Sequence, residues 1–150
     1  MTSSSGDETI GSDNAPRAIV AGHGSLPQGL VNAVDCISGR GSDFLVFSNY
    51  GLTGIDIEEK LREEAALHGI KVFFTDLPGG SATVAVRRMM RTDSALVLVT
   101  GANLSTLLEF AFQTEASPAE AAKAAADKGR GTLVAFGDGE AKPVVPTGDR

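Results

Sequence analysis

The chain has 150 residues, 42% of them hydrophobic and 21% charged, a balance that suits one soluble domain with a packed core. Its formal charge of -6 argues against nucleic-acid or anionic-membrane binding, because such binding needs clustered Lys and Arg. No apolar run approaches the roughly 18 residues that span a bilayer, so we expect any membrane role to be indirect. The single cysteine, Cys36, excludes an internal disulfide, suits a reducing cytoplasm, and has apolar neighbours that predict an inert core thiol.

The chain opens with a polar segment. Residues 1–15 are rich in Ser, Gly and Asp and have too little apolar surface to offset the entropy of ordering, so a disordered tail is predicted.

Residues 18–21 form an apolar run that ends in Gly-His-Gly, which is typical of a buried strand and a turn. A helix is expected next, with Ser25 as its cap, Pro27 in its first turn and Gly39 as its stop. Three apolar residues at helical spacing are expected to face inward: Leu30, Val34 and Ile37.

The strand-helix cycle then repeats. The predicted elements are strands over residues 44–47, 71–75 and 95–100, and helices over residues 55–68, 81–90 and 104–113. Thr53 and Asp56 have the spacing of a capping box, and Val86 and Met90 fit a buried stripe of their helix. The continuous apolar run before Thr100 indicates a strand covered on both faces.

The last predicted elements are a helix and a strand. Ser117 opens an alanine-rich helix that Gly129 is expected to close, and its small side chains suit a packed or oligomer-facing position. Residues 132–136 predict a fifth strand, and residues 138–150 predict a flexible tail because they are rich in Pro and Gly. The organisation expected is therefore one domain over residues 16–137 between two tails.

The alternation predicts an α/β fold, a doubly wound and mostly parallel sheet with helices on both faces. Ligands of such sheets bind beyond the carboxyl ends of the strands, where the strand order reverses. In the order 2-1-3-4, the first and third strands are neighbours at that point. The loops after these two strands, residues 22–25 and 76–81, are therefore expected to face each other.

These loops bring together the residues that we expect to carry chemistry. If Asp76 hydrogen-bonds one ring nitrogen of His23, it fixes the tautomer and leaves the other nitrogen free as a nucleophile. Phosphoryl groups are stabilised by free amides at helix N-termini, and Ser81 adds a hydroxyl. The predicted catalytic residues are His23, Asp76 and Ser81, and the predicted phosphoryl-binding residues are Gly24, Ser25, Gly79 and Gly80. We expect no metal and no cofactor.

The same residues allow other interpretations. A histidine between glycines is often only a turn residue, and a hydrolase triad lacks its nucleophile elbow because Ser25 follows a His turn. A dinucleotide site is disfavoured because the loop lacks a third glycine and no acidic residue ends the second strand. His68 fits a solvated helix end. Arg87, Arg88 and Arg91 form a basic cluster that is either solvated or meets an acidic partner.

The chain resembles the mannose-type enzyme IIA proteins of the bacterial sugar phosphotransferase system. Three segments carry the resemblance: residues 18–25 with the His, residues 76–81 with the Asp-x-x-Gly-Gly-Ser pattern, and residues 99–104 with Gly-x-Asn before a hydrophobic residue. The likeness covers roughly residues 17–136. Two residues depart from the family pattern, Ala82 and Ser105, each where a Pro is usual, and this bears on partner or sugar specificity.

The resemblance implies that His23 takes a phosphoryl group from the phosphocarrier protein HPr and passes it to an enzyme IIB component. It also implies that Asp76 orients the ring, that Ser81 binds phosphoryl oxygens, and that the protein is a cytoplasmic homodimer with its fifth strand, antiparallel, exchanged between subunits. Two alternatives stay open. One is the related subunit that serves dihydroxyacetone kinase, and the other is a regulatory module whose phosphorylation state controls another protein.

Overall fold

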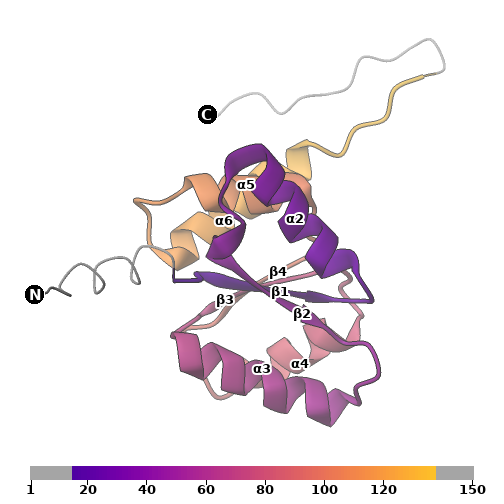
Figure 1. The fold of residues 1–150 in the computed structure, drawn as a ribbon, viewed down its shortest axis with the longest axis vertical. Helices are drawn as coiled ribbons and strands as arrows, with labels where there is room; N and C mark the ends of the chain where they lie inside the picture. Colours follow the sequence, from indigo (N-terminus) through magenta and orange to yellow (C-terminus); the bar gives the residue numbers. More distant parts are fainter. Residues whose placement is uncertain (1–14, 138–150) are drawn as a thin grey trace, which may run out of the picture.

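The computed structural model describes residues 15–137. It has one parallel four-stranded sheet between two layers of helices (Figure 1). The strands are β1 (Ala18–Gly22), β2 (Phe44–Ser48), β3 (Val72–Thr75) and β4 (Val97–Thr100), in the order β2-β1-β3-β4. The predicted fold class and the order 2-1-3-4 are thus confirmed. Because β1 and β3 are paired in register from Ala18↔Val72 to Ala21↔Thr75, the loops that follow them start side by side.

The helices are divided between the two faces of the sheet. One face carries α2 (Leu26–Ser38), α5 (Leu104–Phe112) and α6 (Pro118–Gly131), and the other carries α3 (Gly54–His68) and α4 (Ser81–Met89) (Figure 1). A short 3-10 helix, η1 (Gly41–Asp43), precedes β2. Each face has its own core because β1 and β3 alternate their buried side chains between the two layers.

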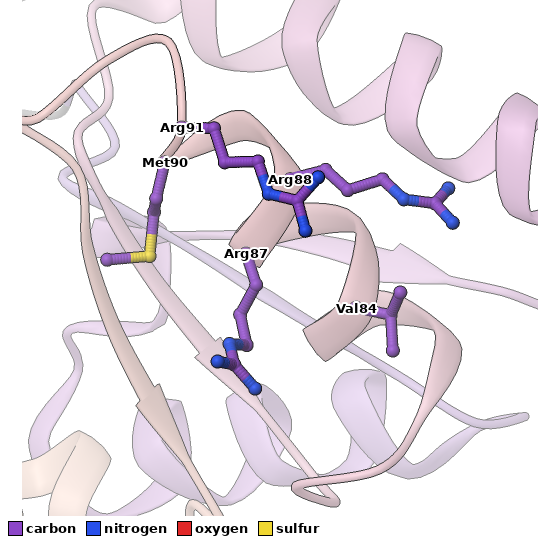
Figure 2. Close-up of a pocket in the computed structure, with 5 residues that line it drawn as sticks. All are labelled: Val84, Arg87, Arg88, Met90 and Arg91. Atoms are coloured by element: carbon purple, nitrogen blue, oxygen red, sulfur yellow. The ribbon is translucent and has the colours of Figure 1, made fainter.

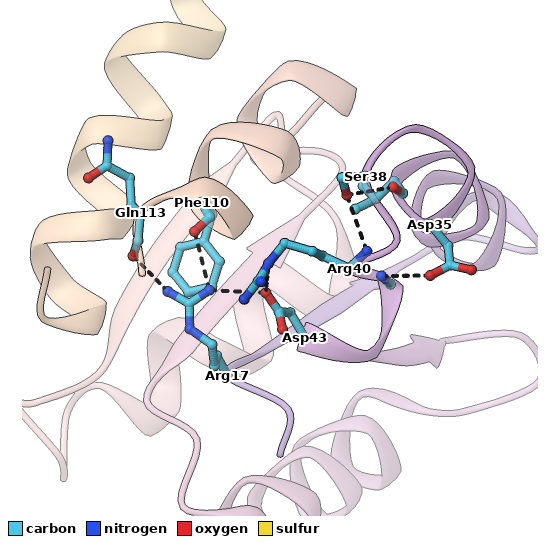
Figure 3. A network of polar contacts seen from close by, with 9 residues as sticks. Arg17, Asp35, Ser38, Arg40, Asp43, Phe110 and Gln113 are labelled. Atoms are coloured by element: carbon cyan, nitrogen blue, oxygen red, sulfur yellow. Dashed lines mark hydrogen bonds and ion pairs between the residues drawn. The ribbon is translucent and has the colours of Figure 1, made fainter. Parts of the chain in front are cut away.

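Aromatic rings lie at the centre of the core that α2, α5 and α6 cover. The Phe74 and Phe110 ring centroids lie 5.2 Å apart, and Phe44 lies 5.8 Å from Phe110. Next to them, the Arg17 guanidinium stacks over the Phe110 ring at 4.4 Å and donates to the carbonyls of Phe110 and Gln113 (Figure 3). Asp43, 6% exposed, pairs with both Arg17 and Arg40. This network ties the amino end of β1 to α5, at the edge of the sheet opposite the carboxyl ends of the strands.

Helix ends follow the expected chemistry in most cases. Thr53 and Asp56 form the predicted capping box, and the Ser117 hydroxyl accepts from the Glu120 amide. Gly39 ends α2 in the left-handed conformation with φ 73°, as its role as a stop requires. Ser25 occupies the N-cap position of α2, but its side chain makes no capping hydrogen bond. The helix therefore starts at the expected residue, but without the capping hydrogen bond expected of the Ser25 hydroxyl.

Three burial predictions are wrong. Ile37 is 60% exposed, Met90 is 37% exposed, and the Cys36 thiol is exposed instead of buried. All three belong to the last turn of a helix or to the residue after it. Helical spacing identifies the face that points to the sheet, but it does not say where along the helix the covering layer ends.

The elements at the carboxyl end also differ from expectation. β4 starts at Val97 instead of Ala95, and it is only partly buried because it is the edge strand. α6 continues past Gly129 to Gly131, since Gly129 is buried against Thr106 of α5 and does not end the helix. Within residues 15–137 no fifth strand forms: after the turn at Thr132, the segment to Gly137 has no strand partner. The predicted strand over residues 132–136 is therefore absent from the isolated chain.

Of the tails expected over residues 1–15 and 138–150, all residues but Ala15 lie outside the described residues, and Ala15 is exposed. The domain boundaries at residues 16 and 137 stay a prediction. Over the described part of the chain, none of the helices is both long enough and apolar enough to cross a membrane.

Candidate functional site

His23 and Asp76 meet at the carboxyl edge of the sheet. His23 directly follows β1, and Asp76 directly follows β3. Parallel register places Ala21 opposite Thr75, so the next residues of the two loops are neighbours. His23 Nδ1 lies 2.8 Å from Asp76 Oδ2, and the His23 amide donates to the same oxygen at 2.9 Å. The contact expected from the strand order is therefore present.

The hydrogen bond to Asp76 determines which ring nitrogen of His23 carries the proton. An ionised carboxylate only accepts hydrogen bonds, so Nδ1 must carry the proton that is donated to Asp76. In the neutral ring, Nε2 is then unprotonated and has a free lone pair. The His23 side chain is 52% exposed, whereas that of Asp76 is 10% exposed. The site thus combines a buried anion with an accessible nucleophilic nitrogen.

The surroundings of Asp76 keep it ionised and fixed. Burial raises the pKa of Asp76, but hydrogen bonds from the His23 amide and ring outweigh burial and hold this pKa below its usual value. An ideal Cβ at Gly22 would lie 2.6 Å from Asp76 Cγ, so only glycine leaves room for the carboxylate there. The second oxygen, Oδ1, is buried and has no hydrogen-bond partner among the described residues. Among the described residues, His23 is the one other residue that hydrogen-bonds this carboxylate.

The N-terminus of α4 lies against the imidazole. Gly80 is the N-cap residue of α4, and an ideal Cβ at Gly80 would lie 3.2 Å from His23 Cε1. The first amides of a helix have no intrahelical acceptor, and the helix dipole favours negative charge at this end. Ser81, the first residue of α4, is exposed beside these amides. An anion bound to the imidazole would meet the N-terminus of this helix.

The remaining predicted residues flank the pair. Gly24 has φ 55°, a conformation that glycine adopts without strain, and it is exposed together with Ser25. The Leu26 amide donates to the His23 carbonyl at 3.1 Å and so closes the turn into α2. Gly79 is exposed in the loop before Gly80. The structure thus gathers both predicted glycine loops around one ring, while His68 lies at the end of α3.

Three threonines below the site were not singled out from the sequence. Thr75 and Thr100 end two paired strands, and Thr83 lies in the first turn of α4. The Thr83 hydroxyl contacts the hydroxyls of Thr75 and Thr100 and donates to the Leu77 carbonyl in the Asp76 loop. The sequence does contain a signal for this cluster. The third and fourth predicted strands both end in Thr, and neighbouring parallel strands place such end residues side by side.

Two cavities lie away from His23. The larger, about 550 Å³, runs along α4 and is lined by the basic cluster with two apolar residues: Val84, Arg87, Arg88, Met90 and Arg91 (Figure 2). Arg88 approaches Glu58 at 3.8 Å, and cations suit this C-terminal end of α4. The smaller, about 220 Å³, lies between β4, α5 and α6. Residues 15–137 contain no group of three or more His, Cys, Asp or Glu side chains arranged to hold a metal ion.

The chain matches the family described as "PTS system fructose IIA component" over residues 17–127. No curated protein matches it. It is similar in structure to the mannose/sorbose specific IIA subunit of the phosphotransferase system (PTS) from Enterococcus faecalis, with a TM-score of 0.70, 22% identity, and coverage of 85% of this chain and 98% of that chain.

Two further solved structures are similar. Component EIIA of the phosphotransferase system from Streptococcus agalactiae has a TM-score of 0.64 and 20% identity, with 75% of this chain and 93% of that chain covered. The PTS IIA protein associated with the fucose utilization operon from Streptococcus pneumoniae has a TM-score of 0.61 and 19% identity, with 75% and 89% covered. At these identities the structures support the fold, and the family match spans both loops of the site. The chain belongs to the family of PTS system fructose IIA components.

Proposed function

We propose that His23 accepts a phosphoryl group on Nε2 and passes it to a second protein. In the first step, the Nε2 lone pair attacks phosphorus, a P–N bond forms, and the bond between phosphorus and the donor breaks with its electron pair leaving on the donor. In the second step, a nucleophile of the acceptor attacks the same phosphorus, and the electron pair returns to Nε2. Phosphorus stays at one oxidation level, so no redox partner is required.

One observation carries this proposal: the 2.8 Å contact between His23 Nδ1 and Asp76 Oδ2 on a ring that is half exposed. The buried carboxylate stabilises the positive charge that develops on the imidazole when Nε2 bonds to phosphorus. The N-terminus of α4 beside the ring supplies amides for the phosphoryl oxygens, and Ser81, the first residue of α4, adds its hydroxyl. Gly24, Ser25 and Gly79 supply exposed backbone around the group.

The exposure of the ring favours proteins as donor and acceptor. Two large apolar side chains that are close in sequence to His23 and Asp76 are exposed, Leu26 at 46% and Leu77 at 55%. A second protein that docks on this rim would exclude water and place its own phosphorylated residue in line. Within a sugar phosphotransferase system, we take the donor to be the phosphocarrier HPr and the acceptor to be an enzyme IIB component.

We also propose a homodimer in which the segment over residues 132–136 pairs with a second copy. Leu133, Val134 and Phe136 are 87%, 41% and 75% exposed, which is unusual for three apolar residues within four positions. β4 is an edge strand of the described sheet, and such an edge offers free backbone groups to another strand. Sedimentation velocity of native chain and of a chain that ends at Gly131 tests this, and equal masses would refute it.

The proposed function is tested by incubation with enzyme I, HPr and labelled phosphoenolpyruvate. We expect one phosphoryl group per native chain and none in His23→Ala, whereas the matched control His68→Ala should label like the native protein, because His68 lies at the end of α3. Equal labelling of His23→Ala would refute the proposal. Transfer from labelled protein to enzyme IIB, to a dihydroxyacetone kinase subunit, or to neither then identifies the acceptor.

A further inference from the structure

Three threonines lie beneath the loop that carries Asp76, and we call them the hydroxyl relay: Thr75, Thr83 and Thr100. Thr75 and Thr100 are a cross-strand pair of β3 and β4, and Thr83 comes from α4. Thr75 is 1% exposed and Thr83 is 2% exposed, so their hydroxyls depend on protein partners for hydrogen bonds.

The Leu77 carbonyl, at the end of the hydroxyl relay, determines which hydroxyl donates and which accepts in each hydrogen bond. Thr83 Oγ1 lies 2.6 Å from the Leu77 carbonyl oxygen, and since a carbonyl only accepts, Thr83 must donate its proton there. The Thr83 oxygen is then free to accept from Thr75 at 2.7 Å and, less closely, from Thr100 at 3.2 Å. Hydrogen bonds therefore run from the two strands through Thr83 to the loop.

The endpoint of the relay is the residue after Asp76. The Leu77 carbonyl also accepts from the Gly80 amide at 3.0 Å, so it closes the turn between Asp76 and the start of α4. Residues on both sides of this turn lie at the imidazole: Asp76 is hydrogen-bonded to Nδ1, and Gly80 is so close to Cε1 that a Cβ on it would lie 3.2 Å from that atom. A shift of the Leu77 carbonyl would therefore move the carboxylate and the helix N-terminus relative to the ring.

We propose that Thr83 is a positioning residue for phosphoryl transfer. It acts through the Leu77 carbonyl and holds the Asp76 loop in the geometry that the imidazole requires. This inference rests on the proposed function of His23. It adds a residue outside the two loops around the ring, and it makes the hydroxyl of this side chain, more than its volume, the property that matters.

The test compares Thr83→Val, which keeps the shape and removes the hydroxyl, with Thr83→Ser, which keeps the hydroxyl. Thr106→Val is the matched control, since Thr106 is 4% exposed and hydrogen-bonded to Asn103 on the other face of the sheet. Two quantities are measured: the ¹⁵N chemical shifts of the His23 ring, and the kinetics of His23 phosphorylation by phospho-HPr.

In Thr83→Val we expect altered ring shifts and a turnover lowered about tenfold, with an unchanged KM for phospho-HPr. This is the size of effect expected from losing the one hydrogen bond that reaches the Asp76 loop, the bond to the Leu77 carbonyl. Thr83→Ser should restore both, and Thr106→Val should lower only the melting temperature. Native shifts and native turnover in Thr83→Val would overturn the inference.

A second variant covers the case that Thr83→Val does not fold. Thr75→Val removes the closer donor to Thr83 and leaves Thr100, so we expect altered ring shifts with a smaller loss of turnover, and native values of both would overturn the inference. If the native protein is never labelled, the proposed function fails, while the ring shifts still report whether the relay holds the His23–Asp76 pair.

Discussion

Replacement of Asp76 by asparagine should slow phosphoryl transfer and leave the fold intact. In the native site, Oδ2 accepts two hydrogen bonds, at 2.8 Å from Nδ1 and 2.9 Å from the His23 amide, and Oδ1 is buried without a partner. An asparagine that keeps its oxygen at the Oδ2 position must put its NH₂ group at the Oδ1 position, where no acceptor is found among the described residues. The opposite orientation aims the NH₂ group at two donors.

The expected magnitude follows from these contacts. Loss of the negative charge roughly halves the strength of the hydrogen bonds to the ring, and a buried NH₂ group without a partner costs about 1 to 3 kcal/mol. If about 1.5 to 3 kcal/mol of this is lost from the stabilisation of the charged imidazole, transfer slows about 10- to 100-fold. Rapid-quench measurement of His23 phosphorylation by phospho-HPr gives this ratio directly.

The pH dependence of stability provides an independent check. The pKa of Asp76 is lowered in the folded protein, so its carboxylate contributes stability that is fully present above the unfolded pKa, about 3.9, and is lost as pH falls through the folded pKa. The difference in unfolding free energy between native protein and Asp76→Asn should therefore shrink as pH falls below about 4. Urea denaturation from neutral to acidic pH measures this difference.

Asp93→Asn is the matched control for both measurements. The pKa of Asp93 is also lowered, chiefly by its hydrogen bond from Lys71, but Asp93 lies in the turn before β4, away from the imidazole. It should show a similar trend with pH and a native rate of transfer. The reasoning would be refuted if Asp76→Asn transferred at the native rate, or if its stability curve ran parallel to that of the native protein at all pH values.

Four further substitutions, one of them a control, test other parts of the structure. Gly22→Ala puts a Cβ 2.6 Å from the Asp76 carboxyl carbon, so it should displace the carboxylate, cost about 1 to 3 kcal/mol in urea denaturation, and slow transfer. Phe110→Ala removes a fully buried ring and should cost about 3 to 5 kcal/mol, with transfer by the folded fraction unchanged. Asp43→Ala leaves two arginines without their shared carboxylate and should cost about 1 to 3 kcal/mol, whereas Asp127→Ala breaks an exposed pair and should change stability by well under 1 kcal/mol.

The sheet and the His23–Asp76 contact could be predicted because both depend on local signals. Short apolar runs that end in glycine loops identify parallel strands, and the strand order then fixes which loops are adjacent. His23 and Asp76 each directly follow a strand, so their contact depends only on β1 and β3 being neighbours. No loop residues separate His23 or Asp76 from its strand, so the strand order is enough to predict that the two side chains meet.

Burial at the ends of the helices could not be predicted in the same way. Helical periodicity gives the direction of a side chain, but whether another layer covers it depends on where neighbouring elements stop. Ile37 and Met90 occupy positions that helical spacing assigns to a buried face, and both are exposed. The strand expected over residues 132–136 shows the related limit, since composition indicates strand preference while a strand also needs a paired edge.

The hydroxyl relay shows why a site predicted from two loops is still incomplete. Thr83 is two residues after Ser81, in a helix whose pattern suggests only an apolar stripe, and its burial at 2% follows from packing between α4 and two strand ends. From the sequence alone, a threonine at this position is explained equally well as a small residue that fills the core between the helix and the sheet. Its link to His23 arises only when the Leu77 carbonyl is placed within 2.6 Å of its hydroxyl, which depends on the turn that Gly80 closes. Residues that touch the reacting ring can thus be identified from sequence motifs, whereas residues that hold those motifs in place are found from three-dimensional contacts.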